Sequence, residues 1–350
     1  MICHTRAPKR VRLYHEGSNT FLYEKHALLV SHQEVLVFGA TVDVYTRHQE
    51  QVLYVSQVDT TGFLTPREAQ SRVTLALLTD FLLTLVKDHV AWRIHVCGCA
   101  SPSLLFPGSQ QNALKRPLGA SALMRWWQRA LDHLVRRHFS STTVEKKYGL
   151  FGLEMDRLPS TETPWSTASL FGDGKQPALA CVPLFDKDIL TDQVLSTAAD
   201  HLSIDAALAL LEFHHDVTRT GGVGLFVLHH PKKNVTEEAE EAPNEEDEVL
   251  QCPILKEDPI NQLLDQAGTF ATLQSAQKAT AKLDALLAEE ATIPKGWQRH
   301  VTTFAVPFVA TVEEKPSVKS IPAVNTMLTV KRKTPPNVLS SNLIRKKVTE

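Results

Sequence analysis

The sequence of 350 residues predicts one α/β domain with a mixed central β-sheet flanked by helices. Two observations support this prediction. Apolar stretches of strand length are interleaved with longer segments of helical periodicity, and the spacing shows no clean strand–helix–strand repeat. Hydrophobic residues make up 43% of the chain, which is enough for a sizeable core. The domain is predicted over residues 21–312, between a poorly ordered N-terminus (1–20) and a basic, proline-rich tail (313–350).

The composition argues against several classes of protein. No stretch approaches 18 consecutive apolar residues, so we expect no membrane span. The first residues include basic side chains but no following apolar region, so no secretory signal is predicted. The five cysteines are odd in number and scattered, which fits a reducing compartment better than a disulfide framework.

The net charge of −2 conceals two strongly charged segments. Eight of the twelve residues from Glu237 to Glu248 are acidic, and we interpret residues 231–253 as a disordered acidic insertion. The tail is basic. It is either a solvated segment or a nuclear-import or nucleic-acid patch, formed by residues 331–333 and 345–347.

In the first half of the chain, Val- and Phe-rich stretches predict strands, and capped apolar repeats predict helices. Residues 35–45 and 52–58 are strands, and the polar residues between them indicate an antiparallel hairpin. A helix then extends to about residue 86, with Thr65 as its cap, Pro66 in its first position and Glu68 completing a capping box. A strand at 92–97 and a helix at 121–139 follow. The apolar stripe of that helix consists of Leu123, Trp127, Leu131 and Leu134.

In the second half, residues 159–174 are predicted to form a loop and residues 178–184 a strand. Two helices come next, at 190–201 and 204–216, the second capped by Ser203. A short strand at 224–228 precedes the acidic insertion. The last predicted element is an amphipathic helix at 259–291.

The turn after the second predicted strand is a candidate anion site. It leads within a few residues to a helix start, where free N–H groups and the helix dipole attract negative charge. Arg67 and Arg72 lie in the first turns, so a pyrophosphate would fit. The alternative is a polar loop capping a helix with surface arginines, and the lack of a glycine-rich phosphate motif favours it.

Two further pairs of residues have both a functional and a structural interpretation. Trp126 and Trp127 are adjacent, and neighbours on a helix point about 100° apart. One ring can therefore face the core and the other a cleft, or both can lie at the edge of the core. Lys115 and Arg116 could meet a phosphate or be ordinary surface charges.

Asp186 and Asp188 follow a predicted strand, where catalytic groups often lie, although a solvated turn explains them equally well. The cysteines of Cys97-Gly98-Cys99 have no second pair at zinc spacing, so we predict no metal site there. The histidine pairs 214–215 and 229–230 are expected to be structural or exposed, because sequence neighbours do not converge on one ion as i, i+4 histidines do.

Taken together, several short motifs resemble the fungal family of histone H3 lysine acetyltransferases of the "regulator of Ty transposition" type, distant relatives of the CBP acetyltransferases. The resemblance covers most of residues 25–230 and implies an acetyl-CoA-binding histone acetyltransferase fold. The motifs that carry it are Leu53 to Phe63, Leu105-Phe106-Pro107, Leu123-Met124-Arg125-Trp126-Trp127 and Val182-Pro183-Leu184-Phe185.

The resemblance implies a histone lysine acetyltransferase that uses acetyl-CoA and no metal. Trp127 matches a residue beside the acetyl-transfer site, and Asp188 matches the proposed acid/base aspartate. The implied acetyl-CoA contacts are Val58, Asp59, Thr60, Arg67, Arg72, Cys97, Ser101, Arg116, Pro117, Leu118 and Trp126.

The implied partners are histone H3–H4 and a histone chaperone that presents it, in the nucleus, with links to chromatin assembly and the DNA damage response. We expect neither membrane association nor sequence-specific nucleic-acid binding. The family's self-acetylated lysine corresponds to Leu190, with Lys187 nearby but on the other side, so the resemblance does not imply self-acetylation. The family's basic insertion and N-terminal extension are mostly missing, so chaperone contacts made through those parts can differ. The alternative is an inactive histone- or chaperone-binding module, which the acidic insertion would suit.

Overall fold

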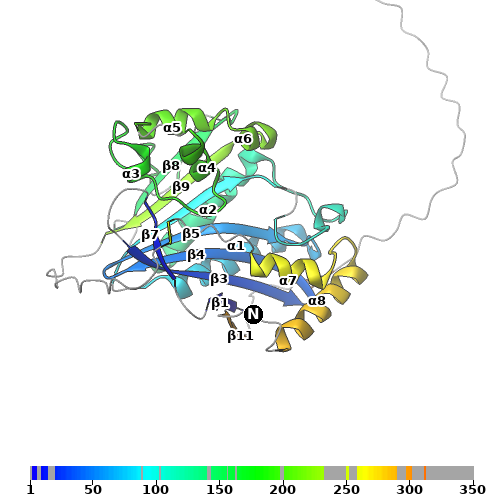
Figure 1. The fold of residues 1–350 in the computed structure, drawn as a ribbon. Helices are drawn as coiled ribbons and strands as arrows, with labels where there is room; N and C mark the ends of the chain where they lie inside the picture. The colour runs from blue at the N-terminus through cyan, green and yellow to red at the C-terminus, as the bar shows by residue number, and fades with distance from the viewer. Residues whose placement is uncertain are drawn as a thin grey trace, which may run out of the picture. The chain divides into compact units, whose positions relative to one another are not determined.

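The computed structural model describes residues 2–5, 9–14, 20–87, 90–101, 104–139, 143–155, 157–161, 164–197, 201–231, 250–251, 258–289, 297–301 and 311–312. The chain divides into two units, residues 1–315 and 316–350, and every described residue belongs to the first. That unit is built on a ten-stranded mixed sheet with helices on both faces (Figure 1). The predicted fold class is confirmed. The basic tail and most of the acidic insertion lie outside the described residues.

The sheet has the strand order β10-β2-β3-β4-β5-β7-β9-β8, and β1 pairs with β3 and β11 at its side. The pairs β10–β2 and β5–β7 are parallel and the other pairs are antiparallel. A separate small sheet joins β6 (Leu64–Thr65) to β12 (Thr311–Val312). The strands of the main sheet are β1 (Ile2–Thr5), β2 (Lys9–Arg12), β3 (Thr20–His32), β4 (Val35–Arg47), β5 (Glu50–Thr60), β7 (Ala91–Cys99), β8 (Glu145–Phe151), β9 (Val223–His230), β10 (Leu250–Gln251) and β11 (Trp297–His300).

The predicted hairpin is confirmed as β4 and β5, and the strands predicted near residues 92–97 and 224–228 are β7 and β9. The prediction of a poorly ordered N-terminus is wrong for residues 2–5 and 9–12, which form β1 and β2. Their partners are β3, β10 and β11. β10 and β11 lie far along the chain from these residues, so their pairing leaves no local signal.

Helices α1 (Arg67–Leu85) and α2 (Ala120–His138) cover one face of the sheet. Both were predicted within two residues of their observed ends. Helix α1 joins the parallel strands β5 and β7, a strand–helix–strand unit that the irregular spacing had hidden. Thr65 does not cap α1, because it pairs in β6 with Thr311; Pro66 is the N-cap, and no side chain caps the helix.

On the other face, the short helices α3 (Ala178–Cys181), α4 (Ile189–Ser196), α5 (Ile204–Leu211) and α6 (His215–Thr220) pack near β9. Helices α7 (Pro259–Ala267) and α8 (Leu273–Ala288) pack near β3 and β4 (Figure 1). A 3₁₀ turn, η1 (Ser109–Gln111), precedes α2. Among the described residues, no helix combines the length and apolar character that a membrane crossing requires.

Three details of these helices differ from prediction. The strand predicted at 178–184 is wrong: α3 is a helical turn, and extended chain follows it, with the Leu184 N–H donating to the Leu13 carbonyl at 2.7 Å. The helix predicted over 204–216 is broken into α5 and α6, although Ser203 caps α5 as predicted. The helix predicted over 259–291 is interrupted at Gly268, whose φ of 132° suits glycine.

The core lies on both sides of the sheet. Beneath α1 and α2 it includes the fully buried Phe81 and Trp92 and most of the predicted α2 stripe. On the opposite face, Tyr23, Tyr45 and Phe185 belong to an aromatic cluster between the two groups of helices. Fully burying a large apolar side chain contributes about 1.5–3 kcal/mol, so both layers stabilise the central strands that lead to the site.

Candidate active site

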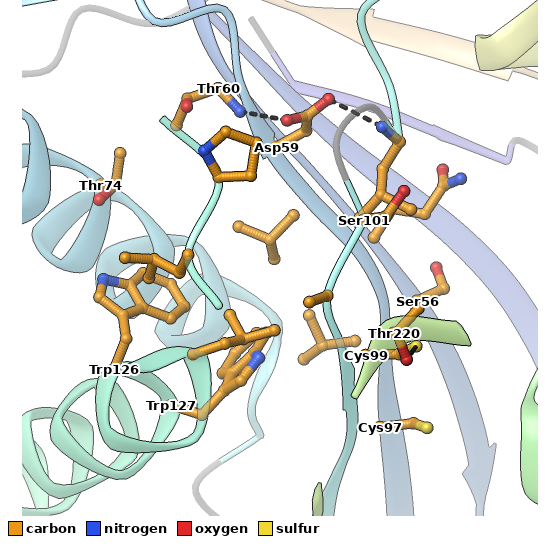
Figure 2. Close-up of a pocket in the computed structure, with 18 of the residues that line it drawn as sticks. Ser56, Asp59, Thr60, Thr74, Cys97, Cys99, Ser101, Trp126, Trp127 and Thr220 are labelled. Carbon is orange, nitrogen blue, oxygen red and sulfur yellow. Dashed lines mark hydrogen bonds between the residues drawn. The ribbon is translucent and has the colours of Figure 1, made fainter. Parts of the chain in front are cut away.

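A cavity of about 570 Å³ lies at the carboxyl ends of β5 and β7 (Figure 2). Because these strands are parallel, the residues that follow them meet at one edge of the sheet. The first turns of α1 and α2 reach the same edge and contribute Gln70 and Leu123 to the lining. The volume is in the range of small-molecule and cofactor sites. Open α/β sheets generally bind ligands at this edge.

Two walls of the cavity face each other (Figure 2). Trp126 and Trp127 project from α2 on one side, and Cys97 and Cys99 of β7 lie on the other. The indole rings meet edge to face, with centroids 4.9 Å apart. Both tryptophans are largely buried, and both line the cavity. The sequence suggested that the rings face a cleft or lie at the edge of the core, and both rings do both.

Asp59 closes one end of the cavity and is occupied by structural contacts. One of its carboxylate oxygens accepts from Lys115 Nζ at 2.7 Å and from the Thr60 N–H at 2.8 Å. The other accepts from the backbone N–H groups of the segment that follows β7: Leu104, Leu105 and Phe106. The side chains of Asp59 and Lys115 are only 7% and 5% exposed. Lys115 lines the cavity and is the buried counter-ion of Asp59, so its interpretation as an ordinary surface charge is wrong.

Exposed cations reach the cavity from several elements, among them the segment before α2, α2 itself, the segment before α4 (Lys187) and α6 (Arg219). Arg116 and Arg129 are exposed and line the cavity. Arg72 is exposed but is not part of the lining, because α1 turns Ser71 and Thr74 toward the cavity instead. The side chain of Arg67 lies outside the described part of the chain. The other lining residues predicted from the sequence are Val58, Thr60, Ser101, Pro117 and Leu118.

Asp188 is not at the end of a strand; it is the N-cap of α4. One carboxylate oxygen accepts from the Thr191 N–H at 3.3 Å, and the other accepts from the Tyr54 hydroxyl at 3.1 Å. The Cys97 thiol also forms a hydrogen bond with this carboxylate. Burial raises the pKa of Asp188 above its usual value, although these hydrogen bonds oppose the rise.

Asp186 is also buried, with 7% of its surface exposed. The interpretation of these two aspartates as part of a solvated turn is therefore wrong. Burial raises the pKa of Asp186 as well, against the opposing charge of Lys187.

Comparison with known proteins identifies the fold. A family model described as the histone acetyltransferase KAT11-type domain matches residues 79–281, more than half of the chain. The chain belongs to the KAT11-type family. The crystal structure of Rtt109 from Aspergillus fumigatus shares this fold, with a TM-score of 0.63 at 20% identity over 85% of this chain and 93% of that one.

Two relatives align with parts of this KAT11-type chain. Histone acetyltransferase rtt109 of Schizosaccharomyces pombe is 27% identical over 229 residues, which cover 60% of this chain and 61% of that protein. Histone acetyltransferase rtt109 of Aspergillus flavus is 32% identical over 161 residues, which cover 42% of this chain and 28% of that protein. The aligned regions thus span less than two thirds of either relative.

Sequence reasoning missed several cavity residues of this KAT11-type domain. Arg129 could have been found, because it follows Trp126 by three residues on one helix and so lies on nearly the same side. Tyr54 gave no such signal, because an irregularity in β5 near Ser56 places its side chain on the opposite face of the sheet from that of Val58. Arg219 and Thr220 gave no signal, since only the return of β9 beside β7 brings α6 to the cavity.

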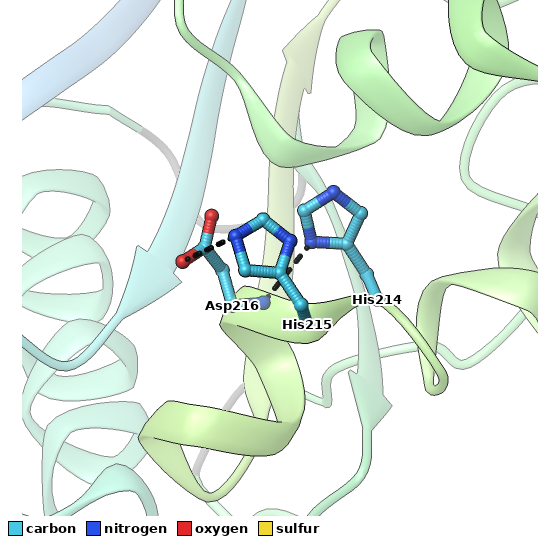
Figure 3. A group of neighbouring side chains, drawn as sticks. All are labelled: His214, His215 and Asp216. Carbon is cyan, nitrogen blue, oxygen red and sulfur yellow. Dashed lines mark hydrogen bonds and ion pairs between the residues drawn. The ribbon is translucent and has the colours of Figure 1, made fainter.

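One group of metal-ligand-type residues is present in the described chain, at the start of α6 (Figure 3). The ligand atoms of His214, His215 and Asp216 lie within 4.8 Å of one another, so the expectation that neighbouring histidines cannot converge is wrong here. Their contacts are those of a helix start. His214 Nδ1 accepts from the Asp216 N–H at 3.3 Å, and the Asp216 carboxylate pairs with Arg219 at 2.8 Å.

Proposed function

We propose that this KAT11-type chain transfers an acetyl group from acetyl-CoA to a histone lysine. The observation that carries the proposal is the tryptophan-walled cavity at the carboxyl ends of β5 and β7. Its size suits a cofactor arm, and its mouth carries exposed arginines. The names of the two sequence relatives, both called histone acetyltransferases, support the same reaction.

Within this proposal, the exposed arginines bind the phosphates of acetyl-CoA. Arg116 and Arg129 are suited to this role because a guanidinium can donate two parallel hydrogen bonds to a phosphate. Val58 and Thr60 border the cofactor arm at the end of β5. Trp126 adds an apolar wall, and Trp127 shapes the channel for the substrate lysine. Asp59 acts indirectly, by holding the segment after β7 in place.

The chemistry requires a proton acceptor. A free lysine has a pKa of about 10.4, so its ammonium must lose a proton before it can attack the thioester. Asp188 is our candidate acceptor, and the rise in its pKa on burial makes it a stronger base than an exposed aspartate. Holding the amine and thioester together can contribute a further 7–11 kcal/mol or so.

The substrate we propose is histone H3 within H3–H4, presented by a histone chaperone in the nucleus, in the setting of chromatin assembly and the DNA damage response. The names of the relatives support histones as the substrate class. The competing proposal is an inactive module that binds histones or chaperones.

Calorimetric titration with acetyl-CoA tests the cofactor site, and Arg137→Ala provides a control on the same helix. Arg129→Ala should weaken binding roughly 10-fold or more, the scale of one lost charge-assisted hydrogen bond. Arg137 pairs with Asp80 and does not line the cavity, so its loss should leave binding unchanged. Equal affinities in all three proteins would argue against this site.

Acetylation of H3–H4, read by mass spectrometry with and without chaperones, tests the reaction. We expect acetyl-lysine on H3. Acetyl-CoA and H3–H4 binding without any transfer would favour the inactive module.

A further inference from the structure

Tyr54 and Cys97 separate the main cavity from Asp188. Both residues line the main cavity, and both line a second cavity of about 20 Å³ that borders Asp188. Asp188 contributes to the second cavity only, although its chain neighbours Lys187 and Ile189 line the first. Among the described residues, Tyr54 and Cys97 are the ones that border both spaces, so they connect a group in the main cavity with this carboxylate.

Tyr54 is the better placed of the two to carry a proton. Its hydroxyl donates to Asp188 Oδ1 at 3.1 Å, and a hydroxyl can accept a hydrogen bond while it donates one. Its ring stacks on Phe185 with centroids 4.3 Å apart and planes 4° apart, which fixes the position of the hydroxyl oxygen. The Cys97 thiol also bonds to Asp188, but a thiol is a weak donor and a weak acceptor.

We propose that Tyr54 relays the substrate lysine's proton to Asp188. This inference rests on the proposed acetyl transfer. The ammonium N–H bond breaks and its proton goes to the Tyr54 oxygen, while the Tyr54 O–H proton goes to Asp188 Oδ1. Tyrosine is neutral before and after this step, and Asp188 becomes a neutral acid. Burial raises the pKa of Tyr54 well above its usual value, which favours concerted movement of the two protons over a tyrosinate intermediate.

The remaining steps balance without another reactant. The neutral amine attacks the thioester carbonyl, the C–S bond breaks, and the leaving thiolate takes the second proton from the new amide nitrogen. The Asp188 proton then returns to solvent through Tyr54 once the products leave. The net change is one amide and one thiol formed, with one proton released.

Tyr54→Phe tests the relay, because it removes only the hydroxyl and keeps the stack on Phe185. We expect kcat to fall roughly 10–100-fold with KM for acetyl-CoA little changed, and a modest fall in thermal stability from the lost buried hydrogen bond. The solvent isotope effect should also change. A proton inventory in mixed H₂O and D₂O should curve in the parent, where two protons move, and become linear in the variant.

Tyr23→Phe is the matched control. Tyr23 belongs to the same aromatic cluster, and its hydroxyl donates to a buried carboxylate, Asp43, at 2.9 Å. It lines neither cavity. The control loses the same kind of hydrogen bond but should keep the parental kcat. Parental kcat in Tyr54→Phe, or an equal fall in both variants, would overturn the proposal; so would loss of turnover in Cys97→Ala alone.

A measurement independent of turnover completes the test. Carboxyl ¹³C NMR should show a higher Asp188 pKa in Tyr54→Phe than in the parent, because the lost hydrogen bond favoured the ionised form. An unchanged pKa would remove the link between the two residues. If that shift is present but the parent transfers no acetyl to any histone, the proposed function fails, and with it the catalytic role of Tyr54.

Discussion

The carboxylate of Asp188 has two roles at the residue scale, and a single substitution can separate them. It caps α4 through the Thr191 N–H, and it is the proton acceptor in the proposed reaction. Asparagine caps helices about as well as aspartate but is not a base. The structural role can therefore be kept while the chemical one is removed.

Asp188→Asn should fold like the parent and bind acetyl-CoA, yet acetylate H3–H4 roughly 10²-fold more slowly or worse, the scale of a lost acid/base group. Initial rates and a thermal melt measure both properties. Asp192→Asn is the control, since Asp192 lies in the first turn of the same helix but is exposed. Parental turnover in Asp188→Asn would mean that another group accepts the proton.

The buried pair of Asp59 and Lys115 supports a prediction about stability. Asp59→Ala leaves the Lys115 ammonium without its carboxylate partner and strips hydrogen bonds from the segment after β7. Removing one partner of a buried pair costs about 3–5 kcal/mol. Urea unfolding should show a loss of this size.

The comparison for that prediction is an exposed pair. Arg137 and Asp80 are 48% and 39% exposed, so Asp80→Ala should change stability by less than about 1 kcal/mol. Similar losses in Asp59→Ala and Asp80→Ala would show that the Asp59 pair has no special structural role.

Trp126 and Arg116 were predicted from the sequence and do line the cavity, because a short motif or the periodicity of a helix was enough to identify them. Prediction failed where the environment depends on distant chain. Lys115 looked like a surface charge because its partner lies 56 residues away. Arg72 was predicted to contact the ligand, but α1 is rotated so that Ser71 and Thr74 line the cavity instead. No motif near Arg72 indicates this rotation.

At the scale of elements, helix α2 lies close to the sheet because two glycines face each other beneath it. Gly98 of β7 pairs with Gly224 of β9. A Cβ on Gly98 would lie 2.9 Å from Trp127 Cδ1, and one on Gly224 would collide with Met124. The missing side chains thus set the depth of the tryptophan wall.

Gly98→Ala should push Trp127 outward and lower acetylation, with a stability loss of about 1–3 kcal/mol, as for other overpacked sites. Steady-state kinetics and tryptophan fluorescence measure the displacement. Gly119→Ala is the control, because nothing lies within 4 Å of the added carbon. Identical fluorescence and rates in Gly98→Ala and the parent would contradict this account of the wall.

Elements with strong local signals were predicted, and elements defined by remote partners were not. Residues 67–85 and 120–138 carry apolar repeats of helix length, so α1 and α2 were found. The apolar stretch at 178–184 is too short for periodicity to distinguish helix from strand. Strands β1 and β2 also pair with β11 and β10, which no short window around them contains.

On the scale of the whole molecule, His95 makes the folded state sensitive to acid. Burial, together with the charges of Arg93 and His229, lowers the pKa of His95 to about 3. Between about pH 6.5 and 3 the unfolded chain binds a proton there that the folded protein does not. Stability due to this residue is therefore complete above pH 6.5 and is lost as the pH falls.

Urea unfolding at pH 7, 6 and 5 should show His95→Phe losing less stability than the parent, by up to about 1.4 kcal/mol per pH unit. Asp186 and Asp188, whose pKa values are raised, act in the opposite direction as their folded forms take up protons early. They are present in both proteins, so the difference between the curves isolates His95. Parallel curves would show that His95 is protonated while the protein is folded.

The strand order sets a minimum length for the connection between β9 and β10. Register places one row of residues across the sheet: His230, Trp92, Gln51, Thr46, Leu22 and Arg10. Leu250 pairs with Val11, the next residue after that row. From His230 to Leu250 the chain thus crosses six strand spacings, about 29 Å, which an extended chain spans with about nine residues. The 19 residues between His230 and Leu250 are about twice this minimum. A connection shortened below about nine residues could not join β9 to β10 while β10 stays paired with β2.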